Sequence, residues 1–540
     1  MACLPALSAL RMAQAGEINQ PVLNGLASPI RLQADPSPPP ALFKVQGIAQ
    51  AAIDTVLGLC QRHLAIENAL PGPSSYAQHN TWAEWQKKET AILCFRPNGT
   101  QGLPLCVLDD VFRNFQQLAT APLPSTPAAA QAMNAAFNLC RTMPNHFKVA
   151  DERSKAFDEC LVPIFRLNWW RAKVYMQTST ELHTGQVDRT YEEDGMIYIL
   201  REDKLEMDTG DPYIQVARDY QLYAEKVRNE NPNLAKQGVP VFLLCLLGPI
   251  LLICGGFHDG KSTIVEPLAE PCLLFDDFLH CRQEVLARQL FALEEGVAAL
   301  RNRSLVVDVN DHAAGVPRVY TTYLAYDDNT ERELKWLISL AASHPRSLLI
   351  VATEDQQATD PKALRLVKLV SKYGDEVHQL LAEHGFAPKL YGHKSLEGAP
   401  TAYVMEYLCP PTGAKPGWIT LWQFFTSNGS KIQYSGAIEK TLNDILAVMA
   451  AARVVHGDLR PNNIMLEVDS NGAPVDKEGV NLKVVDFDWA GNSGDVHYPL
   501  QRNEDITWPA SPWTSIVVAH DRTLVEGWWR QQFTLEFRRM

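Results

Sequence analysis

Residues 455–464 read V-H-G-D-L-R-P-N-N-I, and residues 484–488 read V-V-D-F-D. Asp458 and Asn463 have the spacing of a catalytic loop in which a carboxylate acts on the attacking hydroxyl and an amide oxygen binds Mg²⁺. Asp486 ends an apolar run typical of a strand and would be the second metal ligand. Arg460 would place a cation beside the transferred phosphate. Together the two segments predict a site for phosphoryl transfer from ATP.

The chain upstream offers the parts of an ATP-binding lobe. Lys368 lies in an alternating apolar run, which predicts a strand whose lysine reaches the phosphates of the nucleotide and assists catalysis. Glu376 lies in the helical pattern that follows and is the expected partner of Lys368, with Asp375 as the alternative. Glu406 and Leu408 end a further predicted strand and would line the hinge that contacts the nucleotide.

One apolar stripe predicts the helix that carries the catalytic loop. Ile438, Leu442, Ile445 and Met449 recur at helical spacing between the hinge and the loop. Residues with this spacing lie on one face of a helix, so we expect that face to be buried.

The two motifs resemble those of the protein-kinase-like superfamily, with informative departures. Gly457 replaces the arginine of H-R-D, Asp488 replaces the glycine of D-F-G, and no G-x-G-x-x-G precedes Lys368. The first two changes resemble small-molecule kinases of the choline-kinase and aminoglycoside-phosphotransferase type. Without the H-R-D arginine, activation by loop phosphorylation is not expected. The missing glycine loop and the short segment after Asp486 leave a non-catalytic pseudokinase scaffold as an alternative.

Further motifs extend this resemblance over residues 320–540. The patterns H-G-D-L-R-x-x-N-I, V-D-F-D-W-A-G, Y-P-x-x-x-N-x-x-I-x-W-P and H-D at 520–521 are similar to those of a large group of fungal kinase-like proteins with a second domain before the kinase. The resemblance implies a fungal source and a bilobal protein-kinase-like fold. It also implies ATP and Mg²⁺ as cofactors, Ser/Thr protein kinase activity, and a protein or small-molecule hydroxyl as the phosphate acceptor.

A second constellation lies in the middle of the chain. Asp188 precedes a predicted turn, and the next strand carries Glu202 and Lys204, which strand periodicity places on one face. This acid followed by E-x-K resembles the PD-(D/E)xK restriction-endonuclease-like superfamily, in which a helix with Gln215 and Tyr220 would follow. The resemblance implies a metal-dependent nuclease site of Asp188, Glu202, Lys204 and Gln215, with the kinase-like domain regulatory. A surface ion pair between Glu202 and Lys204 is the alternative.

Two further patterns predict ordinary strands. Residues 255–262 fit the P-loop pattern G-x-x-x-x-G-K-S, but β-branched residues and two prolines follow where a long helix would be needed. A hairpin is therefore predicted there. Residues 239–257 are long enough to span a bilayer, but Gly248-Pro249 divides them into two strand-length halves. We therefore expect two buried strands.

Composition completes the prediction of an α+β multidomain protein. The chain has 540 residues and a net charge of −13, which argues against broad binding to nucleic acid or anionic membranes; nucleic acid would bind only through the middle domain. Its 11 scattered cysteines indicate reduced thiols in the cytoplasm or nucleus, and the N-terminus is a poor signal peptide. We expect an N-terminal helical and linker region (1–130), a nuclease-like α/β domain (131–300) and a protein-kinase-like domain (301–540).

Overall fold

The structure is a computed structural model. It describes residues 73–88, 91–96, 100, 102–177, 184–193, 195–206, 211–232, 238–259, 262–276, 281–303, 317–339, 349–353, 363–412, 415–427, 432–476 and 479–539. Most of the predicted N-terminal region therefore lies outside the described residues. Among the helices that are described, none is long and apolar enough to cross a membrane.

The middle of the chain forms a seven-stranded sheet in the order β1-β2-β3-β4-β5-β6, with β7 paired to β5. Among the described strands of this sheet, β3 and β4 are the parallel pair, because α10 carries the chain across one face of the sheet between them. Asp211 caps the start of α10 by accepting hydrogen bonds from the backbone amides of Tyr213 (3.0 Å) and Ile214 (3.2 Å). The elements are β1 (Trp170–Gln177), β2 (Thr184–Glu193), β3 (Met196–Lys204), α10 (Pro212–Glu230), β4 (Val241–Leu247), β5 (Ile250–His258), β6 (Thr263–Pro267) and β7 (Cys272–Leu273).

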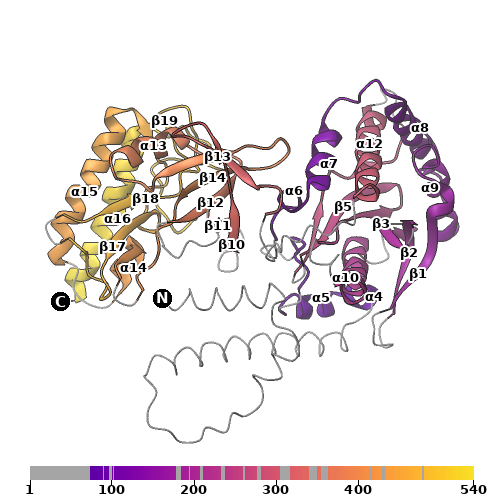
Figure 1. Cartoon of the computed structure of the whole chain (residues 1–540), viewed down its shortest axis with the longest axis horizontal. Helices are drawn as coiled ribbons and strands as arrows, with labels where there is room; N and C mark the ends of the chain where they lie inside the picture. The colour runs from indigo at the N-terminus through magenta and orange to yellow at the C-terminus, as the bar shows by residue number, and fades with distance from the viewer. Residues whose placement is uncertain are drawn as a thin grey trace, which may run out of the picture.

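Helices cover both faces of this sheet (Figure 1). One face carries α7 (Asp110–Thr120), α8 (Pro127–Thr142), α9 (Ala150–Cys160) and α12 (Cys281–Arg301), preceded by the short α6 (Leu105–Leu108). The other face carries α10 with α4 (Pro73–Tyr76) and α5 (His79–Trp85). Each face has its own buried apolar cluster, so the middle of the chain is a three-layer α/β/α unit.

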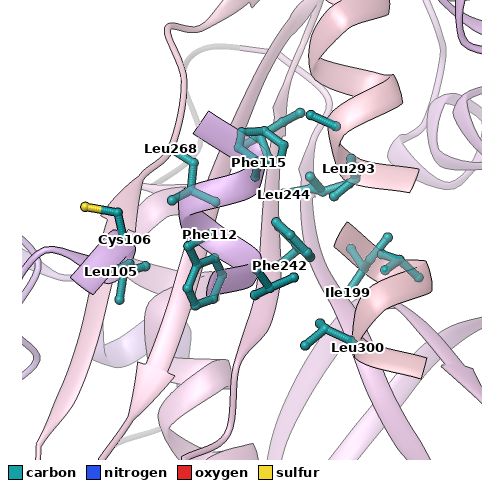
Figure 2. Packing of buried hydrophobic residues seen from close by; sticks show 14 of the residues in the cluster. Leu105, Cys106, Phe112, Phe115, Ile199, Phe242, Leu244, Leu268, Leu293 and Leu300 are labelled. Atoms are coloured by element: carbon teal, nitrogen blue, oxygen red, sulfur yellow. The ribbon is translucent and has the colours of Figure 1, made fainter. Parts of the chain in front are cut away.

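The apolar core under α7 crosses the predicted boundary at residue 130. Figure 2 shows Phe112 and Phe115 of α7 packed against Phe242 of β4, with ring centroids 5.6 Å apart in each pair. The same cluster continues into the C-terminal sheet through buried Tyr320 and Tyr323. Residues 102–120 therefore pack as part of the middle unit, and its core is continuous with the sheet that follows.

The long apolar stretch forms two strands, as predicted. β4 and β5 pair antiparallel, and Gly248 has a φ of +55°, a conformation that glycine adopts without strain. The P-loop-like segment also lies in a hairpin, because β5 pairs antiparallel with β6 and His258 faces Thr263. Gly260 and Lys261 themselves lie outside the described residues.

The C-terminal part begins with a second seven-stranded sheet, in the order β10-β11-β12-β14-β13-β8-β9. The predicted lysine strand is β12, and the predicted helix after it is α13 (Asp375–Glu383). The connection between β10 and β11, where a glycine loop would lie, is outside the described residues. The strands are β8 (Thr322–Ala325), β9 (Glu331–Glu333), β10 (Lys335–Ser339), β11 (Leu349–Thr353), β12 (Leu364–Val370), β13 (Leu390–Lys394) and β14 (Thr401–Glu406).

Helices and short sheets form the remainder. The predicted apolar stripe is confirmed on α15: Ile438, Leu442, Ile445 and Met449 are all at most 2% exposed. They pack in one cluster with residues of α16 and of the strands around the predicted catalytic loop. The elements are β15 (Gly417–Thr420), α14 (Leu421–Thr426), α15 (Ile432–Ala451), β16 (Val454–Val455), β17 (Ile464–Val468), β18 (Leu482–Val484), β19 (Gly491–Asn492) and α16 (Val518–Arg539).

Candidate functional site

A buried aspartate of α16 holds the start of the predicted catalytic loop. The carboxylate of Asp521 accepts hydrogen bonds from the backbone amides of His456 (2.8 Å) and Gly457 (2.9 Å). Burial raises the pKa of Asp521 to about 6, although the two hydrogen bonds act to lower it. Gly457 has a φ of +80°, and a Cβ there would lie 2.8 Å from Cδ1 of Ile516. A bulky side chain, such as the arginine of H-R-D, would be strained at this position.

Asp458 follows directly and is surrounded by donors. Both of its carboxylate oxygens contact the guanidinium of Arg460, and the Nη2–Oδ2 distance is 2.6 Å. Asn463 donates through Nδ2 to Oδ2 of Asp458 at 2.9 Å and to its backbone oxygen at 3.0 Å. Burial raises the pKa of Asp458, whereas Arg460 and Asn463 lower it. The carboxylate is therefore fixed in one orientation, with a cation at its side.

Lys368 reaches the second motif from β12. Its ammonium contacts the carboxylates of Asp486 and Asp488. Asp486 has a φ of +73°, a conformation that a non-glycine residue adopts only where its surroundings enforce it. Desolvation acts to raise the pKa of Asp486, but the Lys368 ammonium and other charges hold that pKa below its ordinary value. For Asp488 desolvation is the larger effect, and the pKa is raised. One ammonium thus faces two carboxylates.

Backbone contacts join the two motifs. Nε2 of His456 hydrogen-bonds to the carbonyl oxygen of Val485 (3.2 Å), and the amide of Val485 donates to the carbonyl oxygen of Asn463 (2.9 Å). Phe487 packs between helix α13 and the loop, with its ring stacked 4.4 Å from that of His378. Burial lowers the pKa of His456 to about 4, so this imidazole is neutral at pH 7. Lys368, Asp458, Asn463 and Asp486 therefore belong to one constellation.

The predicted partner of Lys368 differs from the one observed, whereas the predicted hinge residues Glu406 and Leu408 lie at or just beyond the end of β14. The expected pairing of Lys368 with Glu376 is not the one in the structure: Glu376 is exposed on α13, and Asp375 accepts a hydrogen bond from the hydroxyl of Tyr326 (3.2 Å). Glu406 ends β14 and forms an ion pair with Lys483 (2.6 Å). Leu408 lies two residues beyond β14 and is half-buried. Both partners of Lys368 belong to the D-F-D segment. Asp486 is one of them, and Asp488, which stands where D-F-G has glycine, supplies the second carboxylate.

The predicted residues of the middle unit also come together. The ammonium of Lys204 lies 2.7 Å from Oε1 of Glu202, and the amide of Asp203 donates to Oδ2 of Asp188 (3.1 Å). Burial, followed by the Asp188 carboxylate, raises the pKa of Glu202 to about 7. Gln215 is buried on α10, which packs against β3.

The opposite face of β3 carries a separate ionic network. Arg201 is fully buried and binds Asp158 of α9 (2.7 Å) and Asp203 (2.7 Å). Arg189, opposite Arg201 in the β2–β3 register, binds the same Asp158 (3.2 Å). Strand alternation therefore sends Arg201 and Asp203 toward α9, and Glu202 and Lys204 toward α10.

Sequence reasoning gave no role to Asp488, Asp521 or Asp219. Asp488 lies in the V-D-F-D-W-A-G segment and Asp521 in the H-D pair, so their place in these motifs was the available signal. Asp219 lies one helical turn after Gln215, on the same face of α10. It is fully buried, which helical spacing alone does not reveal.

The comparisons with known proteins give no family and only partial structural matches. No family model and no curated protein matches the chain. Solved structures that match in part are the kinase PK-1 of Cydia pomonella granulovirus (17% identity, TM-score 0.22), WaaP in complex with acyl carrier protein (17%, 0.21) and the BubR1 kinase domain (14%, 0.23). The matches cover 32%, 29% and 32% of this chain and only 57%, 62% and 50% of those chains, in the same order. At these values the likeness decides nothing about function.

Proposed function

We propose that the C-terminal part is an ATP-dependent phosphotransferase of the protein-kinase-like superfamily that acts as a Ser/Thr protein kinase. The observation that carries the proposal is the convergence of Lys368, Asp486, Asp458 and Asn463 through the contacts described above. Phosphoryl transfer needs a cation beside the phosphates, oxygen ligands for a metal ion and a carboxylate for the acceptor hydroxyl. Lys368 would be the cation, Asp486 and Asn463 the metal ligands, and Asp458 the carboxylate.

In this proposal each side chain acts on one part of the reaction. Asp458, held by Arg460 and Asn463, would orient the acceptor hydroxyl and accept its proton as the new O–P bond forms. The bond between the γ-phosphorus and the bridging oxygen of ATP breaks in the same transfer, and ADP leaves with that oxygen. Arg460 and Lys368 offset negative charge on the phosphates. Asp521 takes no part in these steps but holds the loop backbone, so it is a positioning residue.

The residues present also suit Mg²⁺. Asp486 and Asp488 bring two carboxylates to the single ammonium of Lys368, which leaves an excess negative charge, and Asp486 is exposed. Carboxylate oxygens are the ligands that Mg²⁺ prefers. Asp486 and Asn463 would hold the ion, which when bound neutralises charge on the phosphates of ATP.

The experiment that tests nucleotide binding is a thermal-shift titration with ATP and MgCl₂. We expect the wild-type chain to be stabilised saturably and Asp486→Ala to bind Mg·ATP at least about tenfold more weakly, because a metal ligand is lost. Lys261→Ala is the matched control, since the strands β5 and β6 on either side of it pair antiparallel and no long helix follows, and it should bind like the wild type.

Two results would contradict this assignment. Loss of binding in Lys261→Ala alone would place the nucleotide at the P-loop-like segment. Absence of any ATP-dependent shift in the wild type would favour the pseudokinase scaffold.

A second candidate function is metal-dependent hydrolysis of nucleic acid by the middle unit, with the kinase-like part regulatory. The contact of Lys204 with Glu202, beside Asp188 on the sheet face covered by α10, favours it. In that reaction the two acids would hold a divalent metal, and Lys204 would stabilise charge on the scissile phosphate.

Cleavage of DNA or RNA in the presence of Mg²⁺ or Mn²⁺ tests the second function. Lys204→Ala should lower the cleavage rate by about 100-fold or more, as expected for loss of a charge-stabilising group. Lys155→Ala, an exposed lysine of α9 on the other face, should leave the rate unchanged. Equal rates for the wild type and Lys204→Ala would identify the cleavage as a contaminant.

A further inference from the structure

Three buried side chains on the α10 face of the middle sheet have acceptor oxygens without a hydrogen-bond partner. They are Oε2 of Glu202, both carboxylate oxygens of Asp219, and Oε1 of Gln215. The three residues are 6%, 0% and 5% exposed. An unsatisfied buried acceptor destabilises the fold, and a charged one does so more strongly, so three such groups call for a common partner.

The fold brings these acceptors close to one another. Gln215 and Asp219 are four residues apart on α10 and so lie on one face of the helix. Glu202 lies on β3, against which α10 packs. In keeping with this packing, the Glu202 carboxylate is, after burial itself, the largest influence that raises the pKa of Asp219.

The neighbouring cations already have partners. Lys204 binds Oε1 of Glu202 and leaves Oε2 without a donor. Arg218, next to Asp219 in the chain, donates to Gln221 (2.7 Å) and lies over the ring of Tyr76 (5.3 Å). What remains is a set of oxygen acceptors without donors, which is the ligand chemistry of a hard divalent cation.

We propose that Glu202, Asp219 and Gln215 bind a divalent cation, Mg²⁺ or Mn²⁺, between β3 and α10. Asp219 and Gln215 are ligands that the E-x-K pattern does not include. Among the described residues, no three His, Cys, Asp or Glu side chains are gathered closely enough to hold a metal. The proposed site has two carboxylates and one amide oxygen, so it is not a group of that kind. The catalytic use of this cation rests on the second candidate function, whereas its binding does not.

Calorimetric titration of the full chain with MnCl₂ tests the site. Asp486→Ala is the background for every variant, so that the kinase-like site does not contribute. We expect saturable binding by this chain, and at least tenfold weaker binding once Asp219→Asn or Glu202→Gln is added. Glu225→Gln is the matched control, because Glu225 is a buried acid of the same helix that lies near Arg218 and Tyr76. It should bind Mn²⁺ like the background.

The alternative is that Asp219 holds a proton and binds no metal. Asparagine has nearly the shape of the protonated acid, so Asp219→Asn would then leave Mn²⁺ binding unchanged, and that result overturns the proposal. Lack of saturable binding in the Asp486→Ala background also overturns it. If Asp219→Asn fails to fold, Glu202→Gln decides in the same way.

Cleavage assays separate this inference from the second function. Metal binding that depends on Asp219 without any cleavage supports the cation site and rejects the nuclease. Metal-dependent cleavage that survives Asp219→Asn supports the nuclease and rejects the site.

Discussion

Asp458→Asn should reduce phosphoryl transfer by about 100-fold or more while leaving the affinity for Mg·ATP within about threefold of wild type, because general base catalysis contributes about 10²–10⁴ in rate. The amide keeps the shape of the carboxylate and can still bond to Asn463, but it cannot accept the proton of the acceptor hydroxyl. The measurement is transfer of labelled phosphate from ATP to a mixture of Ser/Thr peptides, together with the thermal-shift titration of the same variant.

Asp444→Asn is the control for this substitution. Asp444 is an exposed acid of α15 that pairs with Lys440, one helical turn away (3.3 Å), and its removal should leave the transfer rate unchanged. Wild-type activity in Asp458→Asn would reject Asp458 as the base. Weakened Mg·ATP binding in that variant would instead show that Asp458 contacts the nucleotide or its metal.

Arg201→Met should destabilise the middle unit by about 3–5 kcal/mol, the usual effect of removing one partner from a buried ion pair. Methionine fills much of the volume beside Phe157 and Trp170 but leaves the carboxylates of Asp158 and Asp203 without their shared guanidinium. The measurement is the midpoint of urea and thermal unfolding, followed by far-UV circular dichroism.

The same network predicts a compensating change. Adding Asp203→Asn to Arg201→Met should cost less than the sum of the two single substitutions, because one of the stranded charges is removed. Arg530→Met is the control, since Arg530 has a 79% exposed side chain in a surface pair with Glu526, and it should change stability by less than about 0.5 kcal/mol. Equal effects of Arg201→Met and Arg530→Met would contradict the role of the network.

Much of the fold could be predicted because its signals are local. The stripe of Ile438 and Met449, the alternating strand of Lys368 and the division at Gly248 depend on periodicity and turn chemistry within short windows. The domain boundary at 130 was harder to place, because Phe112 and Phe115 pack against Phe242. That contact joins distant parts of the chain and leaves no mark in local composition.

The candidate sites divide in the same way. Asp458, Asn463 and Asp486 follow from motif spacing, and Glu202 and Lys204 follow from strand alternation. The partner of Lys368 could not be chosen from sequence. The sequence offered Glu376 and Asp375, and only the tertiary arrangement brings Lys368 to Asp486 and Asp488. Asp219 carries no motif; its buried carboxylate becomes notable only when the groups around it are known.

The continuous core between the two sheets limits how this chain can be divided for study. The amides of Arg318 and Val319 donate to the carbonyl oxygen of Val107 (2.9 and 3.3 Å), and Arg113 donates to the carbonyl oxygen of Glu397 (3.1 Å). A fragment that begins at residue 301 would lose the Val107 acceptor and the Arg113 donor, and it would expose Tyr320 and Tyr323 to water. Such a fragment risks aggregation and poor yield for reasons unrelated to the proposed chemistry, so an inactive fragment would say little about the intact chain.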